Sequence, residues 1–241
     1  MAGHSKFKNI MHRKDAQDKK RAQIFAKLSK ELSVAAREGA DQEFNPRLRA
    51  AVAAAKAQNM PNDNIKRAIE RAARGEADNY EEVRYEGYGP GGVAVIIESL
   101  TDNRNRTAAE LRSAFSKHGG NLAETGSVAF MFYRSGIIIY PVLVASSDQV
   151  FDAAIEAGAD DIVSSDQHHT ITCEPDNLGK ACTILAKYLG QPETFSIAWK
   201  AHNKITIDDG NAHTVANLIK ALEDSDDVQT VVTNADVGNQ L

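Results

Sequence analysis

The lysines and arginines in the first third of this sequence have the most distinctive chemistry. Residues 1–77 hold 17 Lys and Arg against 9 Asp and Glu, a net charge of +8, whereas residues 78–241 hold 11 against 24, a net charge of −13. Lysine binds phosphate as a flexible point charge, and arginine does so through paired hydrogen bonds. The asymmetry favours a basic module for a polyanion on an acidic body. We expect nucleic-acid contact at Lys6, Lys8, Arg13, Lys14, Lys19, Lys20, Arg21, Lys27, Lys30, Arg67, Arg71 and Arg74.

A long helix over residues 14–38 is predicted to position most of these cations. Its apolar residues recur at helical spacing, and Gly39 ends the run as a C-terminal cap. On a helical projection the side opposite the apolar sector is cationic, whereas Lys14 and Arg21 lie near that sector at the first turns. The apolar positions are Ile24, Phe25, Leu28, Leu32, Ala35 and Ala36, and the opposite cations are Lys19, Lys20, Lys27, Lys30 and Arg37.

Two shorter helices are predicted to complete a three-helix bundle. One begins at Asn45 and Pro46, an N-cap followed by a proline at the first helical position, and it ends before Pro61. The other runs from about Asn62 to Arg74, with its arginines opposite an apolar stripe.

The segment before the bundle, residues 2–13, has no convincing helical period. We interpret it as a mobile basic arm that gains order on a phosphate backbone, or as a frayed terminus.

A second group of cations lies in the polar segment 101–107, where a predicted strand meets a predicted helix. Asp102, Asn103 and Thr107 can act as helix caps. Arg104 and Arg106 are unusual in an acidic body, and they suit a secondary phosphate contact, a contact between domains or plain solvation.

Other motifs give no support to catalysis, a cofactor or a metal. The glycines of 87–92 satisfy G-x-G-x-x-G, but they precede a strand rather than a helix, so we interpret them as a hairpin turn. His168 and His169 are adjacent on a predicted strand and therefore face opposite sides. The carboxylates of 223–227 flank a helix end and are interpreted as caps and solvated charge. We therefore predict no catalytic residue, no cofactor, no metal site and no small-molecule substrate.

From residue 78 onward the apolar period changes from 3.6 to 2, which predicts an α+β body. Residues 136–201 spell strand, helix, strand, strand, helix, strand, the ferredoxin-like order. The flanking segments 93–133 and 204–234 spell the same order again. We therefore predict a multi-domain α and α+β protein in which one ferredoxin-like domain is inserted into another. Its parts are a basic helical domain (1–77), an α+β domain (78–134 plus 204–241) and an inserted α+β domain (135–203).

Bulk composition places the chain among cytoplasmic proteins. The sequence contains no run of about 18 apolar residues, which is the length that would predict a membrane span. The N-terminus lacks the apolar stretch of a secretory signal, and two cysteines are too few for a disulfide framework. No membrane partner is expected.

Several long strings are similar to those of the YebC family: MAGHSKFKNIMHRK, NPRLRAAV, NMPNDNIKRAIERA, YEGYGPGGVAVIIESLTDNRNRT, FSKHGGNL, GSVAFMF and LEDSDDVQTVVTNAD. The resemblance runs from end to end. It implies an all-helical domain and two α+β domains in a probable DNA-binding transcriptional regulator. Relatives in bacteria and mitochondria, which include translational activators of cytochrome oxidase, are linked instead to translation on the ribosome. This sequence departs from the family at Phe7-Lys8, where Trp-Ala is common, and at Ala123-Glu124, where a glycine is frequent.

Three functions follow as expectations. The first is a non-enzymatic, DNA-binding regulator of transcription that acts through the basic helical domain. The second is a ribosome-associated translation factor that uses the same surface on ribosomal RNA or tRNA. An enzyme is the least supported. Neither a base-reading recognition helix nor an RNA-stacking aromatic motif is visible in the sequence.

Overall fold

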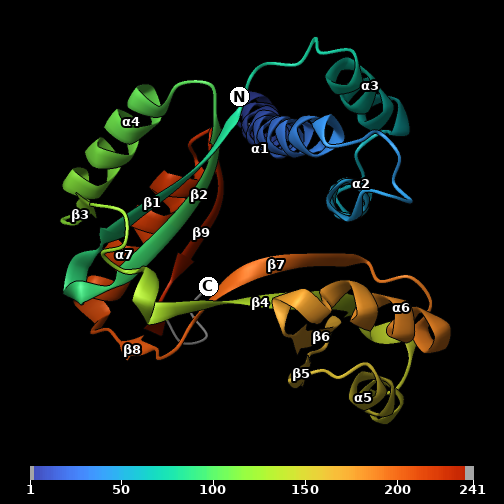
Figure 1. Cartoon of the computed structure of the whole chain (residues 1–241). Coiled ribbons are helices and arrows are strands. Elements are labelled where there is room, and N and C mark those ends of the chain that lie inside the picture. The colour runs from blue at the N-terminus through green and yellow to red at the C-terminus, as the bar shows by residue number, and fades with distance from the viewer. Residues whose placement is uncertain (1–2, 237–241) are drawn as a thin grey trace.

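A computed structural model of the chain describes the backbone of residues 3–236 and, except for Asp209, the side chains of residues 17–236. An N-terminal helical region is followed by two four-stranded antiparallel sheets, and the long strands β4 and β7 run from one sheet to the other (Figure 1). No helix of the described part is long and apolar enough to cross a lipid bilayer.

The helical region consists of α1 (Gly3–Arg37), α2 (Pro46–Ala57) and α3 (Asn62–Ala73). Leu32, Leu48 and Ile65, one from each helix, lie in its core. Asn45 joins two of the helices, because its Oδ1 accepts from Leu48 N (2.9 Å) while its Nδ2 donates to the carbonyls of Ala35 and Gly39 (2.7 Å each). The predicted three-helix region is confirmed.

The N-terminal arm is helical, which corrects the expectation of a mobile or frayed segment. Helix α1 begins at Gly3 and includes residues 3–13 without a break. An apolar period reports a buried face rather than helical backbone, so a helix that extends beyond its packing partners shows no such period. Side chains of this part lie outside the described residues, and so do the expected contacts of Lys6, Lys8, Arg13 and Lys14.

The first sheet has the strand order β3-β1-β2-β9. Its strands are β1 (Glu81–Tyr88), β2 (Ala94–Thr101), β3 (Asn121–Ala123) and β9 (Val228–Thr233). Helices α4 (Arg104–Lys117) and α7 (Asp209–Glu223) pack on one face through Leu111, Phe115 and Leu218. The opposite face, at Ala94 and Ile96, packs against Phe132 of β4 and Trp199 of β7.

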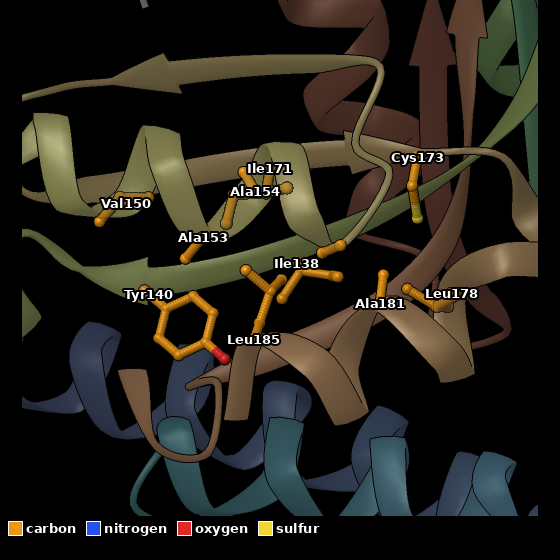
Figure 2. Packing of buried hydrophobic residues seen from close by; sticks show 11 residues of the cluster. Ile138, Tyr140, Val150, Ala153, Ala154, Ile171, Cys173, Leu178, Ala181 and Leu185 are labelled. Atoms are coloured by element: carbon orange, nitrogen blue, oxygen red, sulfur yellow. The ribbon is translucent and has the colours of Figure 1, made fainter. Parts of the chain in front are cut away.

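The second sheet has the order β5-β6-β4-β7, which is the ferredoxin-like arrangement that residues 136–201 predict. Its strands are β4 (Phe132–Pro141), β5 (Asp161–Ser164), β6 (His168–Cys173) and β7 (Thr194–Ala201). Helices α5 (Ser147–Glu156) and α6 (Leu178–Leu189) cover one face. Figure 2 shows Ile138, Tyr140, Ala154 and Leu185 together between this sheet and its helices.

The first sheet departs from the predicted order at two positions, and at its edge β3 (Asn121–Ala123) takes the place predicted for the strand 128–133. The segment 204–208 forms only the short strand β8 (Ile205–Thr206), which pairs in parallel with β10 (Ala235–Asp236) outside the main sheet. Strand β1, which precedes the repeated pattern, takes the place between β2 and β3. A β1–β2 hairpin needs only the short turn around η1 (Pro90–Gly92), so this pairing forms locally.

The predicted strands 128–133 and 136–142 are also rearranged. Residues Ala129–Met131 form the 3-10 turn η2, and a single strand, β4, follows it. The buried Glu86 carboxylate accepts from Val128 N (2.8 Å) and Ala129 N (3.0 Å), so a side chain rather than a neighbouring strand satisfies these amides. Two further 3-10 turns, η3 (Val142–Val144) and η4 (Pro175–Asn177), precede α5 and α6.

Candidate nucleic-acid interface

The first group of expected contacts lies on the N-terminal half of the described part of α1. Lys19, Lys20 and Arg21 are exposed, and the Arg21 guanidinium lies 5.2 Å from the centroid of the Phe25 ring. Among side chains from residue 17 onward, no carboxylate lies within 4.0 Å of Lys19 or Lys20. Toward the side chains that the structure describes, both ammonium groups are exposed and without an ion pair.

The second group lies on α3. Arg67, Arg71 and Arg74 are exposed, and the hydrogen bonds of the first two stay within α3 and the turn after it. Arg67 Nε donates to Asp63 O (3.3 Å), and an Arg71 amine donates to Glu76 O (3.4 Å). None of the three forms an ion pair with a described carboxylate.

Further along α1, Lys27 and Lys30 contact the protein itself. Lys27 Nζ donates to Glu223 O (2.5 Å), and Gln23 Nε2 donates to Asp224 O (2.6 Å). These acceptors stand at the C-terminal end of α7, where helix carbonyls lack intrahelical partners and the helix dipole favours a cation. Burial lowers the pKa of Lys27, and the nearby carboxylates of 223–226 oppose that effect. The cationic side of α1 is thus divided between solvent and the end of α7.

The contact of Lys30 is with Asp227, whose carboxylate is buried (4% exposed). Lys30 Nζ lies 2.7 Å from Asp227 Oδ1. The other oxygen, Oδ2, accepts from Arg106 Nη2 (2.9 Å), from Thr107 Oγ1 (2.8 Å) and from Thr101 Oγ1 (3.1 Å). The Asp227 carboxylate therefore joins α1, the end of β2, the start of α4 and the start of β9.

Burial by itself would raise the pKa of Asp227, but hydrogen bonds from Lys30, Arg106 and Thr107 lower that pKa to about 2. The carboxylate is therefore ionised at neutral pH, with a cation on each oxygen. Tyr80 lies beside it, with its ring centroid 5.2 Å from Lys30 Nζ. Burial, followed by the hydrogen bond with Asp78, raises the Tyr80 pKa to about 12.

The two arginines of 101–107 have different surroundings. Arg106 bonds to Asp102 (2.7 Å) and Asp227 (2.9 Å), which makes it part of the contact between α4, β9 and α1. Arg104 is exposed, and its Nε lies 3.8 Å from a Glu81 oxygen. The domain-contact alternative therefore describes the geometry of Arg106, and Arg104 remains accessible to solvent.

Sequence reasoning missed the role of Asp227. The acidic segment 223–227 is not merely caps and solvated charge, because Asp227 is buried and the carbonyls of Glu223 and Asp224 accept from α1. The pattern gives no sign that α1 lies against this turn, since Lys30 and Asp227 are 197 residues apart. A signal was present in the family-like strings: TDNRNRT supplies Thr101, Arg106 and Thr107, and LEDSDD supplies Asp227.

The remaining motifs have structural roles. The glycines of 87–92 surround the β1–β2 turn, which confirms the hairpin interpretation. His169 is buried, with Nδ1 2.7 Å from Ser164 Oγ and Nε2 3.2 Å from Ala145 O. Within the described part of the chain, no group of three or more His, Cys, Asp or Glu is placed to hold a metal ion.

Comparison with known proteins places these features in a family. Residues 5–75 match the family model described as the TACO1/YebC protein N-terminal domain. Residues 80–235 match the model described as the TACO1/YebC second and third domain, whose short name denotes a transcription regulator. The crystal structure of a conserved hypothetical protein, Aq1575 from Aquifex aeolicus, is similar to this chain, with a TM-score of 0.82 and 44% sequence identity over 90% of each chain.

Proposed function

The chain belongs to the TACO1/YebC family, and from this premise we propose that it is a non-enzymatic regulator of gene expression that binds DNA through its helical region. The observation that carries the proposal is the set of exposed cations on α1 and α3. They stand on a region of net charge +8 in a chain whose remainder is −13. Exposed cations on one region of an acidic protein attract a polyanion and keep it away from the rest.

Phosphate contact accounts for most of this chemistry. Lys19 and Lys20 are point charges that suit phosphate and are poor at bidentate recognition of a base edge. We therefore expect specificity over random DNA to be on the order of 10–100-fold, below the ~10³ or more of dedicated operator binders.

Charge reversal tests the assignment. The variant Lys19→Glu/Lys20→Glu should weaken binding to duplex DNA and change the slope of log affinity against log salt by about 2 units, one for each lost phosphate contact. The matched control is Lys180→Glu/Lys187→Glu, which makes the same charge change at exposed positions of α6. A slope that stays at the wild-type value in the α1 variant, or moves equally in the control, contradicts the proposal.

A second candidate function is binding of ribosomal RNA or tRNA in translation. The cations of α1 favour it as much as DNA, because phosphate contacts position a nucleic acid without identifying it. Competition at fixed salt between a candidate promoter duplex, a scrambled duplex and a structured ribosomal RNA fragment separates the two functions. Preference for the RNA assigns the protein to translation. A thousand-fold preference for one promoter assigns it to transcription and refutes the expectation of modest specificity.

A further inference from the structure

The second sheet has one covered face and one open face. Strand register places Ile138, Tyr140 and Ile171 on the face under α5 and α6. Residues at alternate positions point the other way. Ile137, Ile139 and Val163 on that side belong to no core cluster of the described residues, and Val163 is 58% exposed. On the side opposite α5 and α6, Val163 is therefore accessible to a partner, whereas Ile137 and Ile139 are half-buried.

Two aromatic rings meet at the end of the β4–β7 pair nearest the first sheet, and the exposed Phe130 lies just before β4. Tyr133 is 40% exposed, and its ring centroid lies 5.0 Å from that of the exposed His202, with a tilt of 36° between the planes. His202 N donates to Met131 O (2.9 Å), and Phe130, the residue before Met131, is 70% exposed. None of these three rings belongs to a described core cluster.

The same two strand ends are basic within an acidic body. Segments 128–134 and 198–204 carry Arg134, Lys200 and Lys204 and no Asp or Glu. Lys200 is the direct cross-strand partner of Tyr133, so the two side chains share one side of the pair. Within the described residues, neither Arg134 nor Lys200 forms an ion pair, and Lys200 Nζ donates to Thr172 Oγ1 (2.9 Å).

Exposed rings beside unpaired cations suit a single strand of nucleic acid. Unpaired bases stack on aromatic and imidazole rings, and cations beside the rings neutralise the phosphates between the bases. Bases inside a duplex are already stacked on one another and cannot reach such rings. The positive charge of the two segments complements a polyanion and disfavours a basic protein partner.

We propose that the Phe130–Tyr133–His202 surface binds single-stranded nucleic acid by base stacking, with Lys200 and Lys204 beside the backbone. This surface is separate from the cations of α1 and α3. It stands whether or not those cations bind a duplex, because it uses other residues and another form of nucleic acid.

The test compares strands that differ only in their bases. The full-length protein is titrated with short fluorescent oligouridylate, with oligothymidylate and with an abasic oligomer of equal length and charge. Tyr133→Ala/His202→Ala should weaken binding of the base-containing strands by roughly 5- to 100-fold and leave binding of the abasic strand unchanged. Tyr133→Phe keeps the ring and should bind as the wild type does. The matched control, Tyr188→Ala/His213→Ala, removes the same residue types at exposed positions of α6 and α7.

Equal affinity of the wild type for abasic and base-containing strands overturns the proposal, as does unchanged affinity in Tyr133→Ala/His202→Ala. Tighter binding of oligouridylate identifies RNA as the strand, and equal binding of both strands supports stacking without sugar recognition. The Lys19→Glu/Lys20→Glu variant distinguishes the two sites. Suppose that this variant keeps full duplex affinity and that the wild type binds base-containing strands more tightly than the abasic strand. The proposed duplex contact of α1 is then contradicted, and the proposed stacking surface is supported.

Discussion

At the scale of single residues, Asp227 shows how a buried charge holds separate segments together. Taking a carboxylate out of water is unfavourable unless its partners restore the lost solvation. Here a lysine, an arginine and two threonines do so, from α1, β2 and α4. The carboxylate accepts hydrogen bonds from three elements, so it is more than an ion pair between two residues. Removal of its charge therefore affects all of them together.

We predict that Asp227→Asn lowers the free energy of unfolding at neutral pH by about 2 kcal/mol or more, because Lys30 and Arg106 lose their common anion. The folded-state pKa of about 2 lies below the ordinary 3.8. This stabilisation is therefore present above pH 3.8, and it is lost as pH falls from about 4 to about 2. Denaturant unfolding across this range measures it. Asp224→Asn, an exposed neighbour, should change stability by less than about 0.5 kcal/mol. A variant whose stability follows that of the wild type at every pH would show that the carboxylate contributes nothing.

At the scale of elements, α1 serves two surfaces at once. Its first described turns present lysines to solvent, and its middle turns donate to the C-terminal end of α7. The same helix therefore carries the proposed phosphate contacts and a contact to the α+β body.

The second prediction concerns this contact. Gln23→Ala/Lys27→Ala leaves two carbonyls at the end of α7 without their donors from α1. We expect a loss of about 1–2 kcal/mol in stability and faster hydrogen exchange along α1. Lys19→Ala/Lys20→Ala, on the same helix, should leave both unchanged. Equal exchange rates in the two variants would mean that α1 does not depend on α7 for its order.

Sequence patterns predict the helices and strands of this fold better than they predict which of these elements pair or pack with one another. Helices and strands report their own buried faces, so α2, α3, α5, α6 and the second sheet follow from local periodicity and caps. The place of β1 in the first sheet does not follow, because the repeated strand pattern points to 204–208 for that position. The Asp227 contact does not follow either, since a buried carboxylate and a solvated one look alike in a sequence. The Tyr133–His202 pair needs the β4–β7 register before its residues meet.

At the scale of the whole molecule, the β4–β7 pair connects two sheets without a loop. Residues 135 and 203, the expected bounds of the inserted domain, lie within β4 and just after β7. Phe132, Trp199 and Ala201 pack against the first sheet, whereas Ile138 and Phe195 pack within the second. Each strand therefore belongs to both cores, and the two-stranded ribbon β4–β7 joins the two sheets.

The last prediction is that the domains remain separable despite this ribbon. All residues of the second core lie between Ile138 and Phe195, so a fragment of residues 136–201 keeps that core complete. We expect it to unfold cooperatively in denaturant, and Leu185→Ala, which empties a fully buried position, should destabilise it by about 2–5 kcal/mol.

The remainder of the chain is the harder case, because its core needs Trp199 and Ala201. Ser135 and Ala198 are directly opposed across the ribbon, so an Asn-Gly turn between them preserves the pairing of Arg134 with Trp199. That shortened protein should stay folded and keep its duplex affinity. A flexible linker that instead replaces 132–201 removes Phe132 and Trp199, and should destabilise the first sheet. If the shortened protein is destabilised as much as the linker variant, the ends of β4 and β7 do not support the first sheet by themselves, and the two domains are less independent than the nested arrangement requires.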